Sequence, residues 1–163
     1  MHLSVFIRVR LLLSAVLLAG CAHARPRQAA VVGTWRVVAV ENRDSAGTLV
    51  RPFGDRPAGY FVYTPDGHFT MQIARTPLAP PFAAGSDRRA TEGELRAAFE
   101  GFFAWYGTYT VDETTHTLTH HIAGSLWPSY TGTDQPRPFR LSGDTLVLGD
   151  ERRARRVLVR EGG

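Results

Sequence analysis

The sequence predicts a single, mainly β domain, either a sandwich or a barrel, that extends from about Val31 to the end of the chain. Three observations support this. Short segments of strand composition, about nine of them, alternate with turn signals; there is no internal repeat; and one segment alone has helical spacing. The 163 residues, 44% of them hydrophobic, suffice for one domain with its own core.

The expected strands follow each other through short turns. Two hairpins stand out, one around Pro65–Gly67 and one around Thr114–Thr115, because turn-forming residues lie between two runs of strand composition. In chain order, the segments are GTWRVVAVEN (33–42), LVRPF (49–53), GYFVYT (59–64), HFTMQIA (68–74), WYGTYTVDE (105–113), HTLTHHIAGS (116–125), RPFRL (137–141), DTLVLG (144–149) and RRVLVR (155–160).

A helix is expected within Thr91–Tyr106. Its apolar residues recur at helical spacing from Leu95 to Phe103, and Thr91 with Glu94 has the spacing of a capping box. Gly93 and Gly101 weaken such a helix, so we expect it to pack on the outside or one mouth of the domain. The preceding segment, 75–89, is a long loop, and loops of this length are often functional.

Alternation along the strands predicts which side chains face inward. In the segment 68–74, the apolar residues share one face and the polar residues share the other. His121 falls outside, whereas His120 is the one titratable group on an otherwise apolar inner face. The rule places inside Trp35, Val37, Phe69, Met71, Ile73, Tyr109, Val111, Leu118, His120, Ile122, Phe139, Leu141, Leu146 and Leu148.

A two-residue turn at Thr114–Thr115 would place Tyr109 directly opposite His120. Three roles remain open for this pair: it fills the core, it orients the polar group of a ligand, or it acts as a general acid and base. We expect no metal site and no cofactor, because His120 and His121 point to opposite faces. A haem held by His120 is the weaker alternative.

The first 20 residues have the layout of a secretory signal, in which Arg8 and Arg10 precede the short apolar run Leu11–Ala19. The run ends in LAGC (18–21), which resembles a bacterial lipobox. This resemblance implies cleavage before Cys21, the only cysteine, and lipid attachment to its sulfur; an ordinary signal with an incidental cysteine is the alternative. Ala22, where the inner-membrane retention signal has aspartate, implies an outer-membrane protein that faces the periplasm.

We therefore expect three parts: a signal peptide (1–20), a lipidated cysteine with a flexible tether (21–31) and the β domain (32–163). Without the leader, 17 arginines stand against 15 acidic residues, a balance too even to indicate nucleic-acid binding. Five arginines crowd the C-terminus, and we interpret them as a solvated edge strand rather than a basic patch. They are Arg152, Arg153, Arg155, Arg156 and Arg160.

Several segments together resemble the lipocalin-like domain family of bacteria and fungi. They are GTWRVV, GYFVYTPDGHFTMQ, FFAWYGTYTVDE, LTHHIAGSLWPSYTGTDQPRPF and LSGDTLVL, in this order, within residues 33–158. The resemblance implies a calycin-type fold, an antiparallel up-and-down β-barrel of eight to ten strands, here with one mid-chain helix. It also implies that Trp35 closes the barrel floor and that Arg160 lies over its ring.

The expected function is binding of a small hydrophobic molecule inside a lipid-anchored barrel of the cell envelope. Trp127 and Tyr130 are expected at the rim of the cavity, in an irregular segment (127–138), with 75–89 as a second rim; ordinary loop packing is the alternative. An isomerase or cyclase that uses Tyr109 and His120, or a non-catalytic envelope interaction module, remain alternatives. The expected ligand-binding residues are Trp35, Phe69, Met71, Tyr109, His120 and Phe139.

Overall fold

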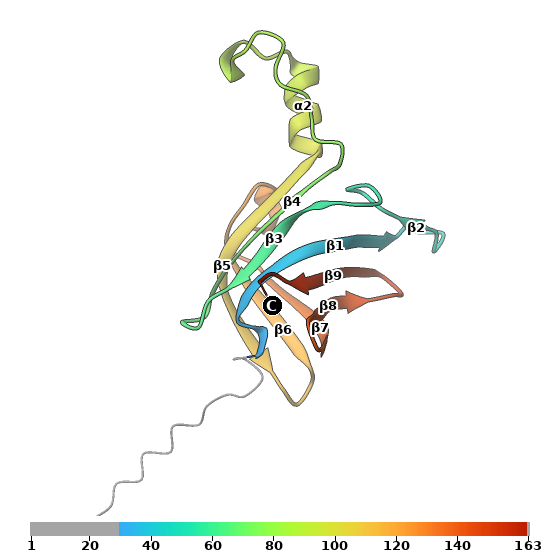
Figure 1. Ribbon diagram of the computed structural model, residues 1–163, viewed down its shortest axis with the longest axis vertical. Coiled ribbons are helices and arrows are strands. Elements are labelled where there is room, and N and C mark those ends of the chain that lie inside the picture. Colours follow the sequence, from blue (N-terminus) through green and yellow to red (C-terminus); the bar gives the residue numbers. More distant parts are fainter. Residues whose placement is uncertain (1–29, 163) are drawn as a thin grey trace, which may run out of the picture.

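The computed structural model describes residues 30–162, which form one closed antiparallel β-barrel (Figure 1). Consecutive strands pair from β3 to β9, and β1 pairs with both β3 and β9, which closes the barrel. The short β2 pairs only with the end of β1. The strands are β1 (Gly33–Arg43), β2 (Leu49–Val50), β3 (Ala58–Tyr63), β4 (His68–Ala74), β5 (Phe102–Asp112), β6 (Thr117–Ser125), β7 (Asp134–Ser142), β8 (Thr145–Asp150) and β9 (Ala154–Arg160). The helices are η1 (Asp87–Arg89), α2 (Glu92–Glu100) and η2 (Pro128–Tyr130).

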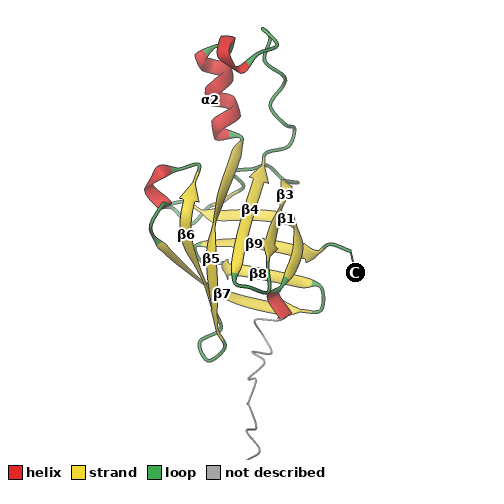
Figure 2. Cartoon of the chain, turned by 90° about the vertical axis from the view of Figure 1, so that its left-hand side faces the viewer, coloured by secondary structure: helices red, strands yellow, loops and turns green. Residues whose placement is uncertain are grey.

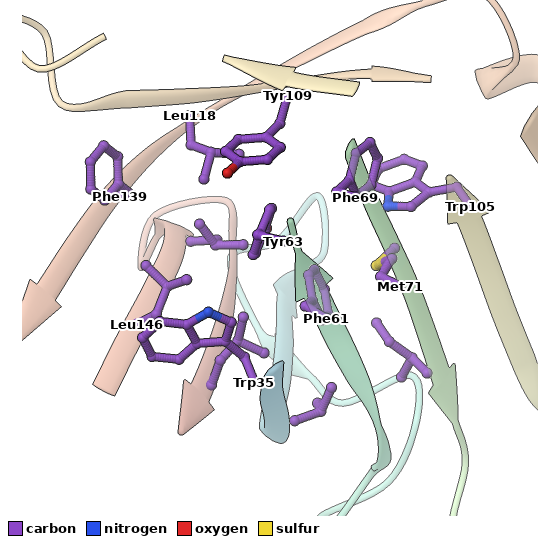
Figure 3. Packing of buried hydrophobic residues seen from close by; sticks show 14 of the residues in the cluster. Trp35, Phe61, Tyr63, Phe69, Met71, Trp105, Tyr109, Leu118, Phe139 and Leu146 are labelled. Carbon is purple, nitrogen blue, oxygen red and sulfur yellow. The ribbon is translucent and has the colours of Figure 1, made fainter. Parts of the chain in front are cut away.

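The predicted mainly β, lipocalin-like barrel is confirmed, and the alternation of side chains explains its core. In β4, Phe69, Met71 and Ile73 are buried, whereas the residues between them are partly exposed. Figure 3 shows the buried side chains converging from strands that are distant in the sequence. All the residues predicted to face inward are buried or, for Val111 and Leu141, packed against the core from its edge.

The pairing of β5 with β6 has the register that the turn at Thr114–Thr115 predicts, and Tyr109 lies opposite His120. Farther along, the register shifts between Tyr106 and Gly107. A Cβ atom at Gly107 would lie 1.9 Å from the His121 carbonyl oxygen, so only glycine permits this close approach of the two strands.

The helix differs from its prediction in both length and packing. Thr91 and Glu94 do form the capping box, but α2 ends at Glu100, and Phe102 already belongs to β5. No residue of α2 is buried, and the helix projects away from the barrel (Figure 2). The expectation that it packs on the domain is therefore wrong; its residues Leu95 and Phe99 remain exposed.

Three other expectations need correction. The C-terminal arginines do not lie on an edge strand, because β9 pairs with β8 on one side and β1 on the other. The segment 127–138 is irregular only in its first part, since β7 begins at Asp134. Val31, assigned to the tether, is fully buried, and its carbonyl accepts a hydrogen bond from Trp35 Nε1 at 2.7 Å. The leader, Cys21 and the rest of the tether lie outside the described residues.

Candidate functional site

One end of the barrel interior is closed and filled. The Trp35 ring is fully buried, and the Arg160 guanidinium carbon lies 4.2 Å from the ring centroid, as the resemblance implied. Arg160 also donates hydrogen bonds to the carbonyls of Val32 (2.8 Å) and Ala30 (2.7 Å). Gly33 has a φ of +133°, and a Cβ there would lie 2.7 Å from Arg160 Nη1. We call this end the closed end.

Above the closed end, His120 is paired with Tyr63 rather than with its strand neighbour. His120 Nε2 and the Tyr63 hydroxyl are 2.8 Å apart, whereas the Tyr109 hydroxyl donates to the Thr64 carbonyl at 3.0 Å. Tyr63 was not predicted as a site residue, although it alternates with Phe61 along β3 and therefore shares its inward face. Tyr63 therefore joins Tyr109 and His120, the pair considered for acid–base chemistry, and its hydroxyl holds the imidazole.

The His120 imidazole and the Tyr63 phenol are both neutral at neutral pH. Burial, with a smaller effect from the positive charge of Arg137, lowers the pKa of His120 to about 3, and the backbone of Gln135 opposes this only in part. Burial also raises the pKa of the Tyr63 phenol well above its ordinary value. A neutral imidazole and a neutral phenol suit a structural hydrogen bond or ligand contact better than proton transfer at neutral pH.

The other end of the barrel interior, which we call the open end, contains a cavity of about 160 Å³. Its walls come from eight strands, which are all the strands except β2, and from η2 with the residue before it and the segment that follows β2. Met71 and His120 are among its buried lining residues, and Arg137 and Arg156 are its charged members. The residues that line it are Asn42, Pro52, Phe53, Phe61, Met71, Ile73, Phe103, Trp105, His120, Trp127, Tyr130, Arg137, Leu148, Ala154 and Arg156.

Four aromatic rings form one wall of the cavity. The Phe103 ring lies 5.2 Å from Trp105 and 4.4 Å from Trp127, and Tyr130 meets Trp105 edge-on at 5.2 Å, all between ring centroids. Trp127 is 36% exposed, so it lies at the edge of the cavity. These rings, which we call the aromatic wall, are suited to enclose a flat apolar ligand.

The residues that line the cavity also include polar groups. Trp105 Nε1 is buried and makes no hydrogen bond. Arg137 donates to Gln135 Oε1 and the Pro136 carbonyl, whereas Arg156 donates to the Asn42 side chain and to backbone carbonyls. A cavity with an apolar wall and a few polar groups is typical of a binding site.

The predicted ligand-binding residues divide between the two ends. Met71 and His120 line the cavity, as do both predicted rim residues, Trp127 and Tyr130. The remaining four fill the rest of the interior and do not line the cavity: Trp35, Phe69, Tyr109 and Phe139. The second predicted rim, residues 75–89, contributes nothing to the lining; it leads outward to α2.

The described residues offer little for other kinds of site. Within residues 30–162, no three His, Cys, Asp or Glu side chains gather where they could hold a metal ion. His121 lies on the outer side and contacts Asp134 Oδ1 at 2.7 Å and Thr110 at 3.1 Å. In the same part of the chain, no helix has both the length and the apolar character needed to span a bilayer.

Comparison with known proteins agrees with this architecture. The chain is similar to the 4'-hydroxy-3'-methoxypropiophenone carrier protein ppsC of Aspergillus oryzae, with 28% identity over 85 residues. The matched part covers 48% of this chain and 76% of the fungal protein. Residues 32–158 match the model of the lipocalin-like domain, a span that includes all nine strands except the end of β9. The chain therefore belongs to the lipocalin-like domain family.

Proposed function

We propose that this protein binds and carries a small, mainly hydrophobic aromatic molecule in the cavity at the open end of its barrel. The observation that carries the proposal is the aromatic wall of Phe103, Trp105, Trp127 and Tyr130 beside an enclosed cavity. The volume of about 160 Å³ is close to the roughly 150 Å³ of an engineered apolar cavity that takes up benzene, so the cavity accommodates one ring. The name of the fungal relative, a carrier of a one-ring aromatic ketone, supports the same class of ligand.

The test is a fluorescence titration of the protein with 4'-hydroxy-3'-methoxypropiophenone. We expect saturable quenching, because Trp105 and Trp127 line the cavity. Trp127→Ala should weaken binding about fivefold to tenfold, since it removes one face of the wall. Tyr106→Ala is the matched control, because Tyr106 is an exposed aromatic residue of the same strand as Trp105 and does not line the cavity. The proposal fails if neither this ketone nor any one-ring aromatic acid or amide binds saturably.

We further propose that the mature protein is attached to the envelope, on the periplasmic face of the outer membrane, through lipid on Cys21. The support is the lipobox-like LAGC sequence after a short apolar run. Ala30 accepts a hydrogen bond from Arg160 at the closed end, so a tether from Cys21 would join the barrel at the end opposite the cavity. Mass spectrometry of the N-terminal peptide should find acylated Cys21, and Cys21→Ser should move the protein to the soluble fraction. An unmodified Cys21 in membrane-bound protein would contradict this proposal.

A further inference from the structure

The two arginines of the cavity lack a carboxylate partner. Among residues 30–162, neither Arg137 nor Arg156 forms an ion pair with an acidic side chain. The nearest acidic side chain along β1, Glu41, is already occupied by Arg155 at 2.5 Å and by Arg51 at 3.3 Å. Arg156 instead donates to the Glu41 backbone carbonyl at 3.1 Å and to Asn42 Oδ1 at 2.9 Å.

Both guanidinium groups are partly withdrawn from water. Burial lowers the pKa of Arg156 to about 10, and the charge of Arg137 lowers it further. Burial also lowers the pKa of Arg137. Both groups nevertheless remain protonated at neutral pH, so the cavity has two positive charges and, among its lining residues, no acidic side chain. Removing unpaired charges from water is costly, and a bound anion would offset that cost.

One more group of the cavity is free to donate. Trp105 Nε1 can only donate a hydrogen bond, and it is buried without an acceptor. A water molecule could accept this hydrogen bond, but it would leave the charges of Arg137 and Arg156 uncompensated.

We propose that the ligand class of this cavity is a one-ring aromatic carboxylate, with its ring against the aromatic wall and its carboxylate at Arg137 and Arg156. Guanidinium groups match carboxylates in both charge and planar geometry. This inference rests on the proposed function, which it narrows from a hydrophobic molecule to an anionic one. The exposed Arg140 on the outer side of β7 provides a comparison within the same strand, because it lies outside the cavity.

The experiment compares trans-cinnamate with trans-cinnamamide, which have nearly the same shape but differ in charge, by calorimetric titration of the full domain at pH 7.5. We expect cinnamate to bind at least tenfold more tightly than the amide. Arg137→Gln and Arg156→Gln should each reduce this preference to threefold or less, whereas Arg140→Gln should leave it unchanged. Thermal unfolding of each variant reports whether it is folded.

The outcomes separate the two proposals. If the amide or the neutral ketone binds as tightly as cinnamate, the carboxylate inference is overturned and the proposed function stands. A preference for cinnamate that persists in both folded cavity variants also overturns it, because the charge would then be recognised elsewhere. If acid, amide and ketone all fail to bind, the proposed function itself is overturned. Should either variant not fold, the acid-to-amide ratio of the unaltered protein decides, and a ratio below two rejects the inference.

Discussion

The two ends of the barrel interior are built from the same strands but differ in how they are filled. At the closed end, Trp35 and Leu118 are fully buried (Figure 3). The guanidinium group of Arg160 donates hydrogen bonds to backbone carbonyls there. At the open end, a cavity remains between the aromatic wall and the two arginines, and the buried Trp105 Nε1 has no acceptor. Unsatisfied groups in an otherwise well-packed protein indicate where a ligand completes the structure.

The largest expected effect comes from truncating a leucine at the closed end. Leu118→Ala should reduce the free energy of unfolding by about 3–4 kcal/mol, because the neighbouring side chains cannot fill the space that the leucine occupied. Leu148→Ala is the matched change at the open end, and we expect about 2 kcal/mol, since Leu148 already borders a cavity and loses fewer contacts. Urea unfolding of both variants measures the difference. Equal losses would show that the open end is packed as tightly as the closed end.

The buried His120 makes stability depend on pH. Its pKa is about 3 in the folded protein, below the ordinary value of 6.5. At a pH between these two values, the imidazole therefore binds a proton in the unfolded chain but not in the folded chain. The stabilisation is complete above pH 6.5 and is lost as the pH falls towards 3. From this group alone, we expect the free energy of unfolding to be about 2–3 kcal/mol lower at pH 4.5 than at pH 7.5.

Urea unfolding across this pH range, for the unaltered protein and for His120→Asn, isolates that contribution from those of the carboxylates. The variant should show a flatter dependence between pH 4.5 and 7.5. As an independent measurement, the NMR signals of the His120 ring should not titrate between pH 8 and 5. Parallel stability curves, or a ring that titrates near pH 6, would mean that water reaches the imidazole through the cavity.

A smaller effect is expected for Arg160→Gln, which removes the cation over Trp35 and the hydrogen bonds to Val32 and Ala30. The loss should be about 1–2 kcal/mol of unfolding free energy. Binding of aromatic probes should change less than twofold, because Arg160 does not line the cavity. Thermal unfolding and the same fluorescence titration test both statements. A marked loss of affinity would show that the closed end and the open end are coupled.

The closed end was more predictable from sequence than the open end, and the reason is physical. Apolar alternation identifies residues that a filled core requires, such as Leu118 and Leu146, and the turn at Thr114–Thr115 set the register of Tyr109 with His120 correctly. Hydrophobicity does not mark an arginine as an inward residue, so Arg137 and Arg156 were missed. The alternation of side chains along β9 nevertheless indicated that Arg156 faces inward, because it lies two residues from the buried Leu158 and on the same face.

Two members of the aromatic wall, Phe103 and Trp105, were missed for a different reason. Phe102 and Phe103 satisfy the helical spacing from Leu95, but Phe103 also alternates with Trp105 and Tyr109 along β5. Pairing with β4, including Ile73 opposite Phe103, decides between the two periods, and Gly101 ends the helix. Local spacing cannot weigh such distant strand contacts. The direct partner of His120 was likewise unpredictable, because Tyr63 approaches from a strand 57 residues earlier.

The smallest expected effect is that of Phe99 on α2, and its matched comparison is Phe103 on β5, four residues later on the predicted helical stripe. Phe103→Ala should reduce the free energy of unfolding by about 3 kcal/mol, because its ring is buried in the aromatic wall. Phe99→Ala should change it by less than about 0.5 kcal/mol, since that ring is half exposed on a projecting helix. Thermal and urea unfolding of both variants measure the contrast. A comparable loss in Phe99→Ala would show that α2 packs on the barrel in solution, and the open end would then have a cover that this structure lacks.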